Sequence, residues 1–76
     1  MMNVEKLKDE IKDRGYSVIG FLHVLEKNGV NMSKNSYYRK LKGETEYTRS
    51  EILGIKEVLG LSNDEIEDIF FNDKVS

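Results

Sequence analysis

The sequence contains no cysteine, no proline and no tryptophan, and it has a single histidine. Without cysteine, a small core has no disulfide to support it and a metal ion has no thiolate ligand. One histidine alone cannot build a His-rich metal site. Stability must therefore come from the packing of helices, and we expect neither a bound metal nor a cofactor.

Long apolar runs are missing as well. No stretch approaches the roughly 20 apolar residues of a membrane span, and the first residues, Met-Met-Asn-Val-Glu-Lys, lack the apolar centre of a signal peptide. We therefore expect no membrane contact and a location in a reducing cytoplasm. A chain of 76 residues makes one domain, in which we expect residues 1–3 and 72–76 to be flexible.

Neither sign of charge dominates the chain, whose formal net charge is -2. The distribution is uneven, because residues 1–26 sum to -1, residues 27–50 to +4 and residues 51–76 to -5. A low net charge argues against a nucleic-acid partner. A basic middle and an acidic last third would nevertheless orient the protein on a polyanion. Chance clustering in a charge-rich sequence is the alternative.

Apolar residues recur at helical spacing in five segments, and this pattern predicts an all-α fold. Each of the first four segments is followed by glycine, the residue most common at a left-handed helix end. Each of the last four opens with serine or threonine, which cap helix N-termini. Two of these openings, Thr48 with Glu51 and Ser62 with Glu65, have the spacing of a capping box. The predicted helices span residues 4–14, 17–28, 33–43, 48–60 and 62–71.

The apolar stripes of these helices predict the core. The connection before the third helix also carries two apolar residues, which we expect to be buried because an otherwise polar loop gives them no other place. The predicted core residues are Val4, Leu7, Ile11, Phe21, Leu22, Leu25, Val30, Met32, Tyr37, Leu41, Ile52, Leu53, Ile55, Leu59, Ile66, Ile69 and Phe70.

The third helix concentrates positive charge, since four of the eleven residues in its segment are basic and none is acidic. A helical wheel turns Tyr37 and Leu41 inward and Asn35, Arg39 and Lys42 to the opposite side. Arginine can pair with guanine edges, asparagine with adenine and lysine with phosphate, so this face suits a DNA major groove. An ordinary solvated basic face is the alternative.

The features also follow a familiar order along the chain. Ser17 opens the second helix, Met32-Ser33 precedes the third, and the third ends with the basic run Arg39-Lys40-Leu41-Lys42-Gly43. Residues 51–61 then form a fourth helix, and the chain closes with an aromatic pair and its tail, Phe70-Phe71-Asn72-Asp73-Lys74-Val75. This order resembles the Cro and phage-repressor (Xre-like) type of helix-turn-helix DNA-binding domain. It is similar, more narrowly, to the short phage regulators with a Phe-Phe-x-x-Lys-Val-like tail.

The resemblance implies a compact five-helix, lambda-repressor-like domain that regulates transcription in a bacterial host cell by binding double-stranded DNA. The helix at residues 33–42 would enter the major groove, and homodimers on a palindromic operator are usual in such families. Base contacts would come from Ser33, Lys34, Asn35, Tyr38 and Arg39. Phosphate contacts would come from Ser17, Lys42 and Arg49.

Three departures from the family pattern stand out. Val18 replaces a glutamine that often contacts the DNA backbone. Leu22, in the second helix, replaces a typical alanine, which would alter how closely the second and third helices approach each other. The connection to the third helix is longer than the usual tight turn, so either the second helix is extended or the turn bulges.

A protein-binding modulator or antirepressor on the same scaffold is the alternative function, which the low net charge and Val18 favour. The acidic fifth helix and Phe71 would then contact another regulator. We expect no enzymatic activity and no small-molecule substrate, because the carboxylates of the fifth helix have no adjacent base or nucleophile: Asp64, Glu65, Glu67 and Asp68.

Overall fold

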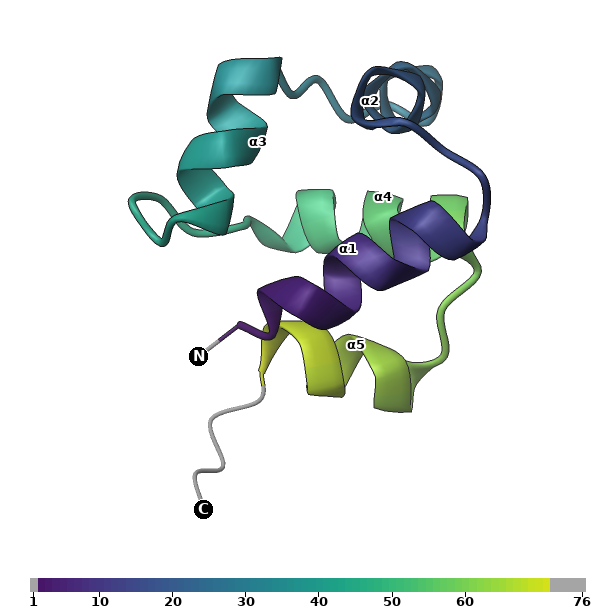
Figure 1. Ribbon diagram of the computed structural model, residues 1–76, viewed down its shortest axis with the longest axis vertical. Helices are drawn as coiled ribbons and strands as arrows, with labels where there is room; N and C mark the ends of the chain where they lie inside the picture. The colour runs from purple at the N-terminus through teal and green to yellow at the C-terminus, as the bar shows by residue number, and fades with distance from the viewer. Residues whose placement is uncertain (1, 72–76) are drawn as a thin grey trace.

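The computed structural model describes residues 2–71, which form five helices and no strand (Figure 1). The all-α prediction is confirmed for this part of the chain, and each helix lies within its predicted range. Residues 72–76, for which the sequence predicts flexibility, lie outside the described residues. The helices are α1 (Val4–Asp13), α2 (Val18–Lys27), α3 (Lys34–Leu41), α4 (Arg49–Leu59) and α5 (Asn63–Phe70).

Side-chain caps define where the helices begin. The hydroxyls at the four predicted N-caps each accept a backbone N–H three residues on, and both predicted capping boxes are complete. Asn3, in the end segment that the sequence predicts to be flexible, caps α1 by accepting the N–H of Lys6 at 3.1 Å. Gly60 closes α4 with a φ of 65°, in the left-handed conformation expected there.

The core draws side chains from all five helices. Its fully buried members include Leu7, Phe21, Tyr37, Ile55 and Ile69. The two apolar residues of the α2–α3 connection also pack as predicted, since Val30 is buried and Met32 is partly buried against the core.

The prediction for Leu53 is wrong, because its side chain is 50% exposed. Its neighbour Gly54 takes the position against the core, and a β-carbon built on Gly54 would clash with Cγ2 of Val30. Only glycine lets α4 approach the α2–α3 connection this closely. A leucine one position away from a tightly packed glycine is therefore turned outward.

The connection between α2 and α3 is a true loop and not an extension of α2. The helix ends at Lys27, and the N–H of Val30 then donates to the carbonyl of Leu25 at 2.9 Å, which turns the chain back toward the core. This contact and the burial of Val30 anchor residues 28–33. The starting point of α3 is therefore tied to the end of α2.

The long axis of the molecule separates α2 and α3 from α5 (Figure 1). Helices α1 and α4 lie between these two ends. The beginning of α1 and the end of α5 lie close together, because the N–H of Asn3 donates to the carbonyl of Ile69 at 2.6 Å.

Candidate nucleic-acid interface

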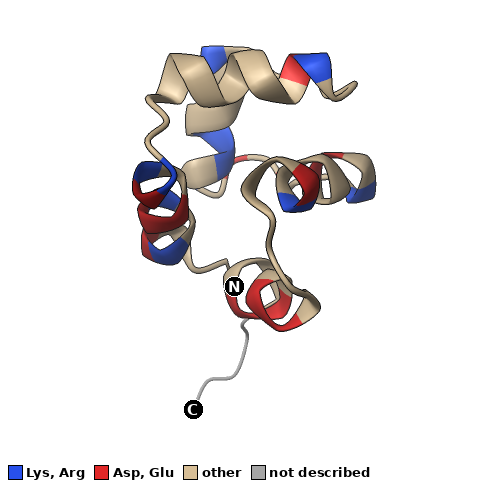
Figure 2. Ribbon diagram, turned by 90° about the vertical axis from the view of Figure 1, so that its right-hand side faces the viewer, with Lys and Arg blue, Asp and Glu red and all other residues tan. Residues whose placement is uncertain are grey.

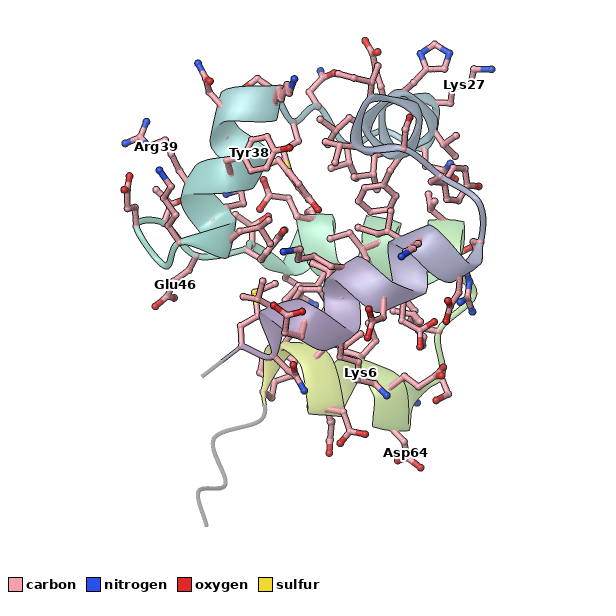
Figure 3. The ribbon with its side chains drawn as sticks, viewed as in Figure 1. Lys6, Lys27, Tyr38, Arg39, Glu46 and Asp64 are labelled. Atoms are coloured by element: carbon pink, nitrogen blue, oxygen red, sulfur yellow. The ribbon has the colours of Figure 1, made fainter. Side chains whose placement is uncertain are left out.

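Helix α3 turns a polar face to solvent and an aromatic side chain to the core. Asn35, Arg39 and Lys42 are exposed, as is Lys34 in the first turn. In Figure 3 the side chain of Arg39 points away from the other helices. Tyr37 is buried, and this burial, with Tyr38 beside it, raises the pKa of its hydroxyl. The predicted orientation of α3 is confirmed, although Leu41 is only partly buried.

Tyr38 combines exposure with a fixed position. Its ring packs edge-on against the ring of Tyr37, with 5.2 Å between centroids, and Tyr37 in turn contacts Phe21 at 6.4 Å. The exposed ring of Tyr38 is therefore supported by the buried ring of Tyr37, which in turn packs against Phe21 in the core. A side chain held in this way loses little conformational freedom when it meets a ligand.

Ser33 and Ser17 lie at the N-termini of α3 and α2. The hydroxyl oxygen of Ser33 accepts the N–H of Ser36 at 3.1 Å, and that of Ser17 accepts the N–H of Gly20 at 3.0 Å. Each hydroxyl keeps its own hydrogen, which can still be donated. Both predicted contacts therefore remain open to a phosphate or a base edge.

Arg39 has an acidic neighbour. Its Nε lies 3.5 Å from Oε1 of Glu44, and both side chains are more than half exposed. The backbone holds the two together, because the N–H of Glu44 donates to the carbonyl of Arg39 at 2.9 Å. An exposed pair of this kind is weak, so Arg39 can still reach another acceptor.

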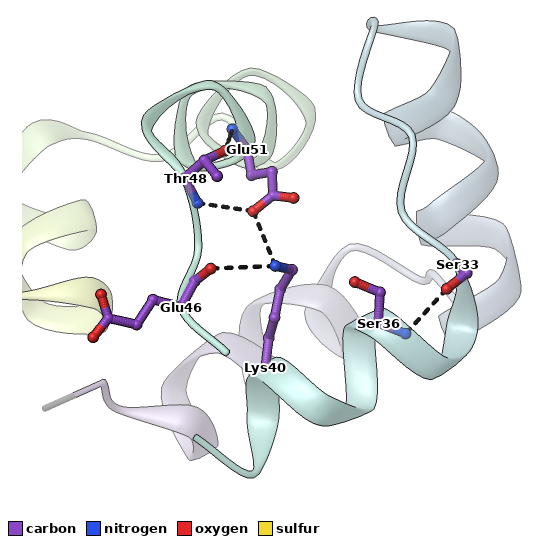
Figure 4. Close-up of polar contacts among 6 residues, drawn as sticks. All are labelled: Ser33, Ser36, Lys40, Glu46, Thr48 and Glu51. Carbon is purple, nitrogen blue, oxygen red and sulfur yellow. Dashed lines mark hydrogen bonds and ion pairs between the residues drawn. The ribbon is translucent and has the colours of Figure 1, made fainter. Parts of the chain in front are cut away.

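Lys40 is the basic residue whose role the sequence analysis missed. It is 8% exposed, and its Nζ donates to the carbonyl of Glu46 at 3.2 Å and pairs with Oε1 of Glu51 at 3.3 Å (Figure 4). It also lies 5.5 Å from the ring centroid of Tyr47. This cation joins α3 to the start of α4. Its position three residues after Tyr37 is the signal that could have placed it on the inner face.

The N-terminus of α4 already has an anionic partner. Oε1 of Glu51 accepts the N–H of Thr48 at 2.8 Å, while the N–H of Glu51 donates to the hydroxyl of Thr48 at 3.2 Å. Arg49 is exposed in the same turn. A phosphate held by Arg49 would lie close to the carboxylate of Glu51, so this predicted contact is the least favourable of the three phosphate contacts.

A shallow hollow of about 460 Å³ lies between α2 and the start of α3. Its walls include Ile19, Ser33 and Lys34. Ile19 is largely exposed and was not singled out by the sequence analysis, although it stands outside the apolar stripe of Phe21 and Leu25. An apolar side chain beside the start of α3 could contact a thymine methyl group.

Charge is divided between the two ends of the molecule. Helix α3 contains no acidic residue, and it carries Lys34 and Arg39 at exposed positions, with the exposed Lys42 directly after it. Helix α5 carries four carboxylates and no basic residue, and these appear at the lower end of Figure 2. The separation of charge inferred from the sequence is therefore also present in the folded structure.

Residues 2–71 contain neither a candidate metal cluster nor a candidate membrane-spanning helix. No three histidine or acidic side chains in this range gather into a group that could hold a metal ion. None of the five helices has the length and apolar character that a membrane crossing requires.

Comparison with protein-family models, with curated proteins and with solved structures gives no match to this chain. The fold and the exposed face of α3 define a small all-α domain with one basic helix. Its function must therefore be argued from the residues themselves.

Proposed function

We propose that this protein is a sequence-specific, double-stranded DNA-binding regulator of phage or prophage origin, acting in the cytoplasm of a bacterial host. The observation that carries the proposal is the exposed face of α3. It offers Asn35, Arg39 and Lys42 on one side, while the helix itself contains no acidic residue. The resemblance to Cro-like regulators supports the same function.

The proposed contacts divide into two kinds. Asn35 and Arg39 can form paired hydrogen bonds with adenine and guanine edges in the major groove, with Ser33, Lys34 and Tyr38 around them. Lys42 and Ser17 can hold phosphates on either side and so set the position of α3, with Arg49 as a weaker third contact. A single helix reads few base pairs, so we expect two copies to bind a palindromic operator.

A selection from randomised duplexes, followed by a salt series, tests the proposal. We expect the selected duplex to bind more tightly than a scrambled one, and log affinity to fall linearly with log salt concentration, since each phosphate contact releases counterions. The decline should be steep, because two bound copies with three phosphate contacts each would together contact about six phosphates. No measurable binding to any duplex at low salt would exclude DNA as the partner.

A protein-binding modulator is the second candidate function. Phe71 is 59% exposed at the end of an acidic helix, which suits a basic protein partner. Lys42→Gln separates the two functions, because it should weaken DNA binding and leave binding through α5 unchanged. If the protein binds a regulator but no duplex, this second function is the right one.

A further inference from the structure

The outer face of α4 carries one exposed apolar side chain between two charges. Half of the Leu53 side chain is exposed, which leaves apolar surface in water. Arg49, four residues before it, and Glu57, four residues after it, are exposed as well. Residues four apart are neighbours on the surface of a helix, so these three side chains form one stripe along α4.

A hollow of about 300 Å³ lies beside this stripe, between α4 and the connection from α2 to α3. Its wall includes Leu53 and Glu57 from α4 and Val30 from the connection. Gly54 also lines the hollow, and its missing side chain lets Val30 come close to α4. An aliphatic side chain seated in this hollow would cover Leu53 and remove apolar surface from water.

Both charges of the stripe are available to a partner. No ion pair within residues 2–71 includes Arg49 or Glu57. One is positive and the other negative, so the stripe as a whole is neutral and two copies of it would not repel each other. A partner surface with charges of one sign would match only one end of the stripe.

The order of the stripe, which is basic, apolar and acidic, is complementary to the same order reversed. When two α4 helices lie antiparallel about a twofold axis at Leu53, the residue four positions before Leu53 in one copy faces the residue four positions after it in the other. Arg49 of each copy therefore faces Glu57 of the second copy. In a parallel pair each charge would instead face its own kind.

We propose that the protein forms a dimer in which two α4 helices pack antiparallel about Leu53. Leu53 of each copy enters the hollow on the other copy, and two ion pairs join Arg49 to Glu57 across the interface. Such an interface is small, so we expect a weak dimer that forms at high protein concentration. Arg49 is also the weakest of the proposed phosphate contacts and can serve one partner at a time, so this dimer is a form of the protein without DNA.

Sedimentation equilibrium of the full chain without DNA, at concentrations up to about 1 mM, measures the association. We expect the parent protein to shift from monomer toward dimer as its concentration rises. Arg49→Glu and Glu57→Arg should each weaken this association about tenfold, because like charges then face each other across the axis. Each change places a charge that the helix dipole favours at its end of α4, so both variants should remain folded.

A mixture of the two single variants tests the pairing of the charges. Association should return in the mixture, because the two acidic side chains of one variant then face the two basic side chains of the other. It should be lost again when Leu53→Asn is added to both variants. Lys8→Glu makes the same charge change as Arg49→Glu at an exposed position of α1, and it should associate like the parent.

The dimer is excluded if the parent protein remains a monomer at about 1 mM. An equal weakening by Lys8→Glu and Arg49→Glu would show that net charge, and not the stripe, governs association. A mixture that associates no better than either variant alone would show that Arg49 and Glu57 do not meet. Because DNA is absent from these measurements, their outcome does not depend on the proposed function.

Discussion

Lys40 and Lys42 are two positions apart and have opposite environments. Lys40 is buried against Glu51, whereas Lys42 is exposed at the end of α3. We expect Lys40→Met to lower the free energy of unfolding by about 2 kcal/mol, because a charged hydrogen-bonding group is removed from a covered site. Denaturant titration measures this loss.

Lys42→Met is the matched control for Lys40→Met. It should leave stability within about 0.5 kcal/mol, as is usual at exposed positions. It should also weaken binding to every duplex alike and reduce the salt slope by about one for each bound copy, whereas Lys40→Met should leave that slope unchanged in the folded protein. A stability loss of the same size in both variants would contradict the assigned roles.

Gly54 is the residue at which the smallest change should have a clear effect. Gly54→Ala places a methyl group against Val30, and we expect a loss of about 1–3 kcal/mol, although alanine usually favours a helix over glycine. Val30→Ala in the same chain makes room for that methyl group. The double variant should therefore be more stable than the sum of the two single effects predicts, as measured in a double-mutant cycle. Strict additivity would show that the two residues do not compete for the same space.

At the scale of elements, the loop after α3 controls how Arg39 is presented. Arg39→Ala should weaken the free energy of DNA binding by about 1–3 kcal/mol and relax the preference for one base pair. Glu44→Gln removes the partner of Arg39, so we expect higher affinity for all duplexes but less preference at that same base pair. Competition between the selected duplex and single-base variants measures both effects.

Glu46→Gln makes the same charge change in the same loop. The carbonyl of Glu46 holds Lys40, but its carboxylate points away from α3 (Figure 4). We therefore expect Glu46→Gln to leave the base preference intact. If both glutamine variants reduce that preference equally, charge alone explains the effect and the contact between Glu44 and Arg39 does not.

The capping box at the N-terminus of α5 should lose stability at acidic pH. The N–H of Ser62 donates to Oε1 of Glu65 at 2.8 Å, and this bond holds the pKa of Glu65 below its ordinary value of 4.5. Because the pKa of this carboxyl is lower in the folded state than in the unfolded state, its ionised form stabilises the fold at pH values above the unfolded-state pKa. This stabilisation is lost as the pH falls through the folded-state pKa. We expect the carboxyl carbon signal of Glu65 to titrate below 4.5.

Glu65→Gln supplies the control for this titration, because glutamine can accept the same N–H without a charge change. Its unfolding free energy should decline less than that of the parent between neutral pH and about pH 3. An equal decline in both proteins would assign acid sensitivity to other carboxyl groups.

Elements of this fold are predictable because their signals are local. The N-caps, the capping boxes and the glycine that ends α4 each depend on residues within one helical turn, and all of them are present. Leu53, Gly54 and Lys40 depend on contacts between elements. A helical wheel of α4 could not show that Val30 would come close enough to require glycine at position 54. A helical wheel of α3 could not show that Glu51 would pair with Lys40.

At the scale of the whole molecule, net charge is a poor guide to the partner. The total of -2 hides a basic end at α3 and an acidic end at α5. On a polyanion the protein would turn its α3 end inward and its α5 end outward. The direction of approach would then be set before any base is contacted.

The contact between Asn3 and Ile69 has a consequence for engineering the chain. Because these two residues are joined by a hydrogen bond, the chain enters and leaves the folded body at almost the same point. A short linker could connect these two points, and new termini could be opened in an exposed loop elsewhere. The body should therefore tolerate circular permutation, and it could be inserted as a unit into a surface loop of another protein with little strain on either partner.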